Sequence, residues 1–170
     1  MLIVFSGLPG TGKTTLARDL AARLTAAYLR IDVIEQSIRN TKTLPANIGT
    51  AGYDVALALA ESNLRIGRPV VADCVNPVAE SRLAWHAVAE GANSRIFDIE
   101  IICSDLAEHR RRVESRIPDI TGLAAPTWRS VQEHDYEPWT SERLVVDTAI
   151  LSVNKALSLI EAHLAGKAAC

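Results

Sequence analysis

The feature that most constrains this chain is a short stretch near its start, Gly7-Leu8-Pro9-Gly10-Thr11-Gly12-Lys13-Thr14. It matches the pattern G-x-x-x-x-G-K-[ST] and directly follows the apolar run Leu2-Ile3-Val4-Phe5. A strand before such a loop and a helix after it hold successive backbone N–H groups so that they point at phosphate oxygens. A chain of this length matches the pattern by chance in only about one per cent of cases. We therefore predict a P-loop that binds a nucleotide.

Each residue type in this loop has an expected role. The glycines let the backbone curl without a Cβ clash, and the following helix points its free N–H groups at the anion. Lys13 is expected to reach the β and γ phosphates, Thr14 to bind Mg²⁺ through its hydroxyl, and Thr15 to contact the preceding phosphate. The loop residues expected to bind nucleotide are Gly7, Pro9, Gly10, Thr11, Gly12, Lys13, Thr14 and Thr15.

Composition limits the classes to which the protein can belong. With 170 residues, 48% of them hydrophobic and 22% charged, we expect a single domain over residues 1–170. The net charge of −2 provides no general attraction to nucleic acid or acidic membranes, which disfavours a long polynucleotide as partner. No apolar stretch approaches the ~20 residues needed to span a bilayer. Met1 leads directly into a strand without the basic start of a signal peptide, so we expect a cytoplasmic protein.

Neither the cysteines nor the histidines indicate a metal centre. Cys74, Cys103 and Cys170 lack C-x-x-C spacing and are odd in number, so we expect no disulfide framework and no zinc site. We interpret Cys74 and Cys103 as small core residues. The histidines are scattered and are expected on the surface or on helix faces; they are His86, His109, His134 and His163.

The hydrophobic pattern predicts strands that alternate with helices. The predicted strands are residues 2–5, 28–32, 69–73, 96–103 and 143–148. The predicted helices begin at Lys13 and near Val33, and then cover 51–66, 78–90, 105–116, a short helix from Thr127 or Ser130, and 153–164. The proline-containing segment 117–126 is predicted to be a mobile loop. Such alternation implies a parallel sheet with helices on both faces, and functional groups then gather at the carboxyl ends of its strands.

Two carboxylates and two arginines are candidates for chemistry at that edge. Asp32 is placed to accept the proton of an acceptor hydroxyl, with a helix N-cap as the alternative interpretation. Asp73 lies where a carboxylate would hold a water bound to Mg²⁺, with a turn residue as the alternative. Arg112 and Arg116 are four residues apart and would close over a triphosphate as a lid, unless they belong to a solvated basic face. For Arg110 and Arg111 we favour the solvated face.

These motifs together resemble the small P-loop kinases, a group that includes gluconate kinase, adenylylsulfate kinase, chloramphenicol phosphotransferase and the kinase domain of polynucleotide kinase. The resemblance rests on the P-loop with Asp32, Val71-Ala72-Asp73 with Asn76, Arg112 and Arg116, and Tyr136-Glu137-Pro138 before Val145-Val146-Asp147-Thr148. It implies a three-layer α/β/α fold with a five-stranded parallel sheet in the order 2-3-1-4-5. It also implies ATP as donor, a helical lid over about residues 105–135, and an adenine pocket around Asp147 and Thr148.

The chain departs from these kinases at one position. Several of them carry an arginine three residues after the aspartate of the second strand, where it helps to hold an anionic acceptor, but this chain has Glu35 there. Arg39, one turn further on, is a candidate substitute. The resemblance therefore does not extend to a phosphate- or sulfate-bearing substrate.

The sequence thus predicts a kinase that transfers the γ-phosphate of Mg·ATP to a hydroxyl of a small molecule. A polynucleotide 5′-kinase-like enzyme and an ATP-hydrolysing switch without an acceptor are the alternatives. A GTPase is disfavoured because the D-x-x-G match at Asp119 lies beyond the fourth strand. The N-K-x-D match at Asn154 has Leu157 in place of the aspartate.

Overall fold

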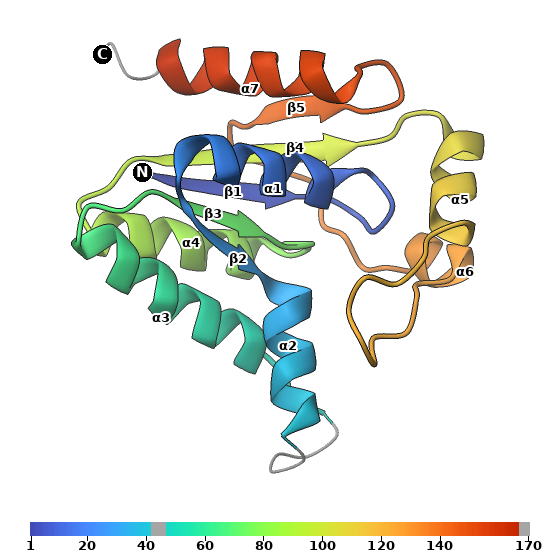
Figure 1. The fold of residues 1–170 in the computed structure, drawn as a ribbon, viewed down its shortest axis with the longest axis horizontal. Coiled ribbons are helices and arrows are strands. Elements are labelled where there is room, and N and C mark those ends of the chain that lie inside the picture. Colours follow the sequence, from blue (N-terminus) through green and yellow to red (C-terminus); the bar gives the residue numbers. More distant parts are fainter. Residues whose placement is uncertain (42–46, 167–170) are drawn as a thin grey trace.

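The computed structural model describes residues 1–41 and 47–166, so Cys170 lies outside the described residues (Figure 1). Its described part contains a sheet of five strands in the order β2-β3-β1-β4-β5, and all neighbouring strands are parallel. The strands are β1 (Leu2–Ser6), β2 (Ala27–Arg30), β3 (Val70–Asp73), β4 (Ile96–Ile102) and β5 (Leu144–Asp147). The predicted sheet and its strand order are confirmed.

Helices cover both faces of the sheet, as Figure 1 shows. On one face lie α1 (Lys13–Leu24) and α7 (Val153–Gly166), and on the other α3 (Ala51–Arg65) and α4 (Ala79–Gly91). Beyond the carboxyl ends of the strands lie α2 (Ile31–Asn40), α5 (Leu106–Glu114) and α6 (Trp128–Gln132). Within the described residues, no helix combines the length and the apolar composition that crossing a bilayer requires.

The central strand β1 explains why the core has two halves. Side chains of a strand alternate between the faces of a sheet, so Ile3 and Phe5 pack toward α1 and α7, while Leu2 and Val4 pack toward α3 and α4. All four are completely buried. Burial on both faces is why this segment reads as a continuous apolar run. The burial of β1 also fixes the position of the P-loop, which follows the strand directly.

The second strand is shorter than predicted. It ends at Arg30, and α2 begins at Ile31, so Asp32 lies in the first turn of a helix and not at the end of a strand. A carboxylate in this position is stabilised by the positive end of the helix dipole. The residue that occupies the strand end is Arg30, which pairs in register with Asp73 of β3.

The helix that carries the arginines is also shorter than predicted. It ends at Glu114, with Ser115 as its C-cap, so Arg116 lies in the connection that follows. Its N-cap is Asp105, whose side chain accepts hydrogen bonds from the N–H groups of Ala107 and Glu108. For α6 the earlier of the two predicted starts is correct, because Thr127 forms the capping box with Ser130.

Candidate active site

The P-loop joins β1 to α1 at the carboxyl edge of the sheet. Gly12 is the N-cap of α1 and has no side chain to accept from the first-turn N–H groups, which are therefore free to bind an anion. Thr11 is buried, and its hydroxyl donates to the Leu8 carbonyl at 2.9 Å. The loop is thus held by hydrogen bonds of its own backbone and of Thr11, with Gly7 N–H donating to the Val75 carbonyl.

Helix α5 packs against the outer side of this loop. His109 is 5% exposed, and its Nε2 lies 2.8 Å from the Pro9 carbonyl, which it therefore contacts as a donor. Its ring lies edge-on to Trp128 with centroids 5.2 Å apart. The prediction for the histidines did not include a contact with the P-loop, because the two residues are far apart in sequence.

Gly10 provides a direct test of this packing. It has a φ of 86°, and a Cβ there would lie 2.4 Å from Cγ2 of Val113 in α5. We expect Gly10→Ala to lower the free energy of unfolding by about 2 kcal/mol and to weaken nucleotide binding, because both backbone strain and overpacking act on the loop. Denaturant unfolding and titration with an ATP analogue measure the two effects.

Gly67 is the matched control for this prediction. It has a similar φ of 79°, but a Cβ there would meet nothing within 4 Å. Gly67→Ala should therefore cost only the backbone strain, about 1 kcal/mol, and leave nucleotide affinity unchanged. Equal effects of the two substitutions on nucleotide affinity would contradict the packing of α5 on the P-loop.

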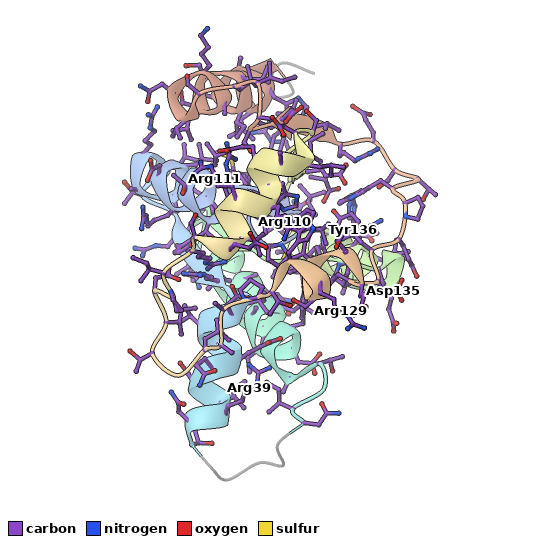
Figure 2. The ribbon with its side chains drawn as sticks, turned by 90° about the vertical axis from the view of Figure 1, so that its right-hand side faces the viewer. Arg39, Arg110, Arg111, Arg129, Asp135 and Tyr136 are labelled. Carbon is purple, nitrogen blue, oxygen red and sulfur yellow. The ribbon has the colours of Figure 1, made fainter. Side chains whose placement is uncertain are left out.

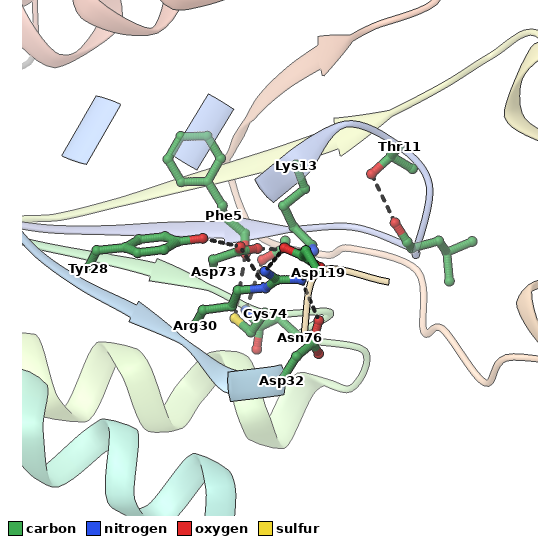
Figure 3. A network of polar contacts seen from close by, with 12 residues as sticks. Phe5, Thr11, Lys13, Tyr28, Arg30, Asp32, Asp73, Cys74, Asn76 and Asp119 are labelled. Atoms are coloured by element: carbon green, nitrogen blue, oxygen red, sulfur yellow. Dashed lines mark hydrogen bonds and ion pairs between the residues drawn. The ribbon is translucent and has the colours of Figure 1, made fainter. Parts of the chain in front are cut away.

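Lys13 and Asp73 form a buried ion pair below the P-loop (Figure 3). Lys13 Nζ lies 3.1 Å from Asp73 Oδ1, and the Tyr28 hydroxyl donates to the other carboxylate oxygen at 2.7 Å. Asp73 is 2% exposed. The burial and the negative charge of Asp73 raise the pKa of Tyr28, so the phenol remains a donor. The role of Tyr28 was not predicted from the sequence.

The charge of Asp73 is maintained by its neighbours. Burial by itself raises the pKa of Asp73, but the charge of Lys13 and hydrogen bonds from Tyr28, Thr14 and Lys13 outweigh it, so the pKa is lowered. A hydroxyl and an ionised carboxylate side by side are suitable oxygen ligands for Mg²⁺ or its bound water. Among the described residues there is no group of three or more histidine, cysteine, aspartate or glutamate side chains that could hold a metal ion.

Arg30 links the floor of the site to the segment after α5. It is 7% exposed, and its two terminal nitrogens both donate to the carboxylate of Asp119, with Nη2–Oδ1 at 3.1 Å. Nη2 also lies 3.6 Å from Asp32 Oδ2, and Nε lies 3.9 Å from Asp73 Oδ2. Arg116 approaches the same Asp119 at 3.3 Å. A charged residue within an otherwise apolar strand was the only sequence signal for Arg30.

The Arg30–Asp119 pair predicts a pH-dependent contribution to stability. The hydrogen bonds from Arg30 hold the pKa of Asp119 well below its usual range. A depressed folded pKa means that the contribution is present above the ordinary aspartate pKa of about 3.9 and is lost as pH falls through the folded value. Asp119→Asn should therefore cost at most about 1 kcal/mol near neutral pH, because Asp119 is half exposed and screened.

The measurement is the difference in unfolding free energy between wild type and Asp119→Asn as a function of pH. We expect a constant difference from about pH 8 to about pH 5 that shrinks below about pH 4. Asp135→Asn, at an exposed aspartate in the segment after α6, is the control and should show little effect. A difference that grows toward acid pH would contradict the assignment of the pair.

Arg112 connects α5 to the segment after β5. Its Nη1 donates to Thr148 Oγ1 at 2.8 Å and its Nη2 to the Thr148 carbonyl at 3.1 Å. The Thr148 hydroxyl donates to the Thr11 carbonyl at 2.7 Å. Arg112 also pairs with Glu108 at 2.7 Å. The P-loop, α5 and the residue after β5 therefore meet at Thr148.

The other residues predicted near this edge have different surroundings. Asp147 Oδ1 accepts from the N–H groups of Ser104 and Ala149, which directs its carboxylate into the turn that it stabilises. Arg110 and Arg111 lie on the outer side of α5 in Figure 2 and pair with glutamates of their own helix. The solvated interpretation of these two arginines is confirmed.

Two cavities lie on either side of Arg112. The first, of about 320 Å³, has the P-loop as its floor and is bordered by charged side chains. These are Lys13, Arg18, Asp32, Arg112, Arg116 and Asp119. The second, of about 500 Å³, lies between Gly12, Thr15, Arg112 and the segment from Thr148 to Val153. We call them the phosphate cavity and the β5 cavity.

The predicted nucleotide-binding residues differ in which cavity they border, and Gly12 and Thr15 border both. Pro9, Gly10, Gly12, Lys13, Thr14 and Thr15 border the phosphate cavity. Gly7 and Thr11 do not border it and instead shape the loop: a Cβ on Gly7 would lie 2.3 Å from the Ile101 carbonyl. Thr148 borders the β5 cavity, whereas Asp147 does not.

Comparison with known proteins identifies the family. A family model described as an AAA domain matches residues 2–122. The chain belongs to this family. The matched residues 2–122 of this chain include the P-loop, Asp32, Asp73, Arg112, Arg116 and Asp119. No curated protein matches the sequence at a significant level.

Solved structures with the same fold include small-molecule kinases. The APS kinase CysC from Mycobacterium tuberculosis, solved with AMPPNP and APS, has a TM-score of 0.68, 19% identity and 96% coverage of each chain. A sugar kinase from Janibacter sp. HTCC2649 has a TM-score of 0.71, 15% identity, and coverage of 96% of this chain and 94% of its own. A gluconokinase from Sinorhizobium meliloti 1021 has a TM-score of 0.63, 19% identity, and coverage of 96% and 91%. The fold is therefore that of the P-loop kinases.

Proposed function

We propose that the protein is an ATP-dependent kinase that transfers the γ-phosphate of Mg·ATP to a hydroxyl of a small acceptor. One observation carries the proposal. The phosphate cavity brings the P-loop together with the side chains of Arg112, Arg116 and Asp32, from segments that are distant in sequence. Phosphoryl transfer requires mainly positioning and charge stabilisation, and these residues are suited to both.

The P-loop side of the cavity is the proposed donor site. The first-turn N–H groups of α1 and Lys13 would bind the phosphates, and Thr14 with Asp73 would hold Mg²⁺. The ion would supply positive charge between the phosphate oxygens. Asp73 keeps Lys13 in place through the 3.1 Å ion pair, so the ammonium group is already ordered at the cavity wall.

Asp32 is the proposed base. Its side chain is 39% exposed and borders the phosphate cavity, where it is available to an acceptor hydroxyl. Arg30, at 3.6 Å, lies on its inner side and orients the carboxylate. A carboxylate placed in this way accepts the hydroxyl proton as the new phosphate ester forms.

The opposite wall of the cavity is the proposed lid, over about residues 105–135. Arg112 and Arg116 face the P-loop across the cavity and would neutralise charge on the transferred phosphate. The β5 cavity begins at Gly12, Arg112 and Thr148 and is the proposed place for the adenine and ribose. Within a single domain over residues 1–170, the nucleotide would then lie across the P-loop from the β5 cavity to Asp32.

A transfer assay tests the proposal. Mg·ATP labelled at the γ-phosphate is incubated with sugars, sugar acids, nucleosides, uncharged alcohols and 5′-hydroxyl oligonucleotides. We expect a labelled small-molecule product that is lost in Asp32→Asn. A labelled oligonucleotide as the main product would identify a polynucleotide kinase instead. Labelled free phosphate at one rate with and without every acceptor would identify an ATP-hydrolysing switch.

A further inference from the structure

A third cavity adjoins the phosphate cavity beneath the segment that follows α5. It has a volume of about 170 Å³ and shares Pro9, Asp32, Arg116 and Asp119 with the phosphate cavity. The rest of its wall is apolar and comes from Pro118, Leu123, Ala124, Ala125 and Pro126. We call it the loop cavity. Asp32 stands at the junction, so a molecule in the loop cavity can present a hydroxyl to Asp32 and to the phosphate cavity together.

The charges on the two cavities differ in sign. The described residues around the phosphate cavity include four cations and two carboxylates, a balance of +2. Those around the loop cavity include one cation, Arg116, and two carboxylates, Asp32 and Asp119, a balance of −1. The loop cavity therefore lacks the excess positive charge that would stabilise an anionic group.

Arg30 brings the balance at the loop cavity to zero. Its positive charge lies behind Asp119, to which both its terminal nitrogens already donate, and Asp32 lies 3.6 Å away. An anionic acceptor would have to displace Asp119, which both terminal nitrogens of Arg30 already bind. The guanidinium group of Arg30 is therefore already bound by a carboxylate of the protein. It is not available to a carboxylate or phosphate of the acceptor.

The size and lining of the loop cavity limit its occupant further. Pockets for drug-sized ligands begin at about 300 Å³, whereas an apolar cavity of about 150 Å³ accommodates benzene. The 170 Å³ of the loop cavity therefore suits a body of benzene size. Its apolar wall offers few partners for the hydroxyls of a polyol, which would lose their hydrogen bonds to water on entry.

We propose that the loop cavity is the acceptor site and that it selects a small alcohol with an uncharged, apolar body. This inference rests on the proposed kinase function. The hydroxyl lies beside Asp32, and the body lies against Leu123, Ala124 and Ala125. In the transfer, the acceptor oxygen forms a bond to the γ-phosphorus as the bond to the β–γ bridging oxygen breaks. The hydroxyl proton goes to Asp32, and ADP leaves.

A matched pair of probes tests the selection by charge. Benzyl alcohols with a para carboxamide or a para carboxylate have the same shape and differ in charge. Transfer from labelled Mg·ATP is measured, and so is binding of each probe in the presence of a non-hydrolysable ATP analogue. We expect the carboxamide to be preferred by about tenfold or more in both measurements, because Arg30 and Arg116 already pair with Asp119 and the ionised probe would lose its hydration in an apolar cavity.

A cavity-filling variant tests the location. Ala124→Phe places a ring in the loop cavity and should weaken carboxamide binding by about tenfold or more, with ATP-analogue affinity unchanged. Ala107→Phe is the matched control, because Ala107 is exposed on α5 and borders none of the three cavities. It should leave probe binding and nucleotide binding as in the wild type.

The outcomes separate this inference from the kinase proposal. Transfer to the carboxylate in preference to the carboxamide would retain the kinase and overturn the selection for an uncharged acceptor. Carboxamide binding that Ala124→Phe leaves intact would overturn the location. If the carboxamide binds in an Ala124-dependent way but receives no phosphate, and no other acceptor does, the kinase proposal fails while the loop cavity stands as a site for an uncharged alcohol.

Discussion

Lys13→Ala is expected to abolish phosphate transfer, with a loss of at least about 10³-fold, while the protein still folds. The ammonium group is the most buried cation at the phosphate cavity, with Lys13 8% exposed, and it is held by Asp73 at 3.1 Å. Its removal takes away a preorganised positive charge where the γ-phosphate is proposed to lie. The labelled-phosphate assay measures the loss, and circular dichroism with thermal unfolding measures the fold.

The same substitution leaves Asp73 buried without its nearest cation. Breaking a buried pair in this way costs about 3 kcal/mol or more. The double variant Lys13→Ala/Asp73→Asn removes the unpaired charge and should recover part of the stability without recovering transfer. Lys155→Ala, at an exposed position on α7, should retain both transfer and stability. Normal transfer by Lys13→Ala would contradict the proposed role of the P-loop in phosphate binding.

Asp32→Asn is expected to reduce transfer by about 10²-fold or more while ATP affinity stays near normal. The amide keeps the shape of the carboxylate but cannot accept a proton. Arg30 keeps Asp119 and Asp73 as partners, so we expect little change in stability. Single-turnover transfer measures the chemical step, and titration with an ATP analogue measures affinity.

The exposed Asp135→Asn is again the matched control and should be as active as the wild type. Transfer at the normal rate by Asp32→Asn would move the role of base to Asp73. That alternative makes its own prediction. Asp73→Asn would then lose transfer even when nucleotide and Mg²⁺ are saturating, whereas a residue that only holds the ion would be partly rescued by high Mg²⁺.

Much of the fold followed from patterns of neighbouring residues. The strand that precedes the P-loop is buried on both faces, and its unbroken apolar run indicates this directly. The strand at 70–73 likewise ends at Asp73 as predicted. The predicted end of β2 at Asp32 was wrong. Leu29-Arg30-Ile31-Asp32 continues the alternation of apolar and charged residues that is typical of a strand. Backbone geometry turns into α2 after Arg30, and no proline or glycine marks that point.

The site was predicted in part. Most of the P-loop residues singled out from the sequence border one cavity together with Asp32, Arg112 and Arg116, whereas Gly7 and Thr11 do not. Arg30 was missed, as was the role of Asp119, which attracted notice only as part of a rejected D-x-x-G match. The adenine pocket implied near Asp147 has a cavity beside Thr148, but the Asp147 carboxylate is bound to backbone N–H groups of the turn.

The sequence by itself determined the anion-binding loop, the alternation of strands and helices, and hence the edge of the sheet where functional groups gather. These are local properties, because residue type directly limits backbone conformation and burial over a few neighbouring positions. Only the tertiary structure decided that Arg30 pairs with Asp119, 89 residues away, and that apolar loop residues enclose a cavity beside Asp32. Which carboxylate the guanidinium of Arg30 reaches depends on how the segment after α5 folds back toward α2. No pattern of neighbouring residues encodes a contact between segments so far apart in sequence.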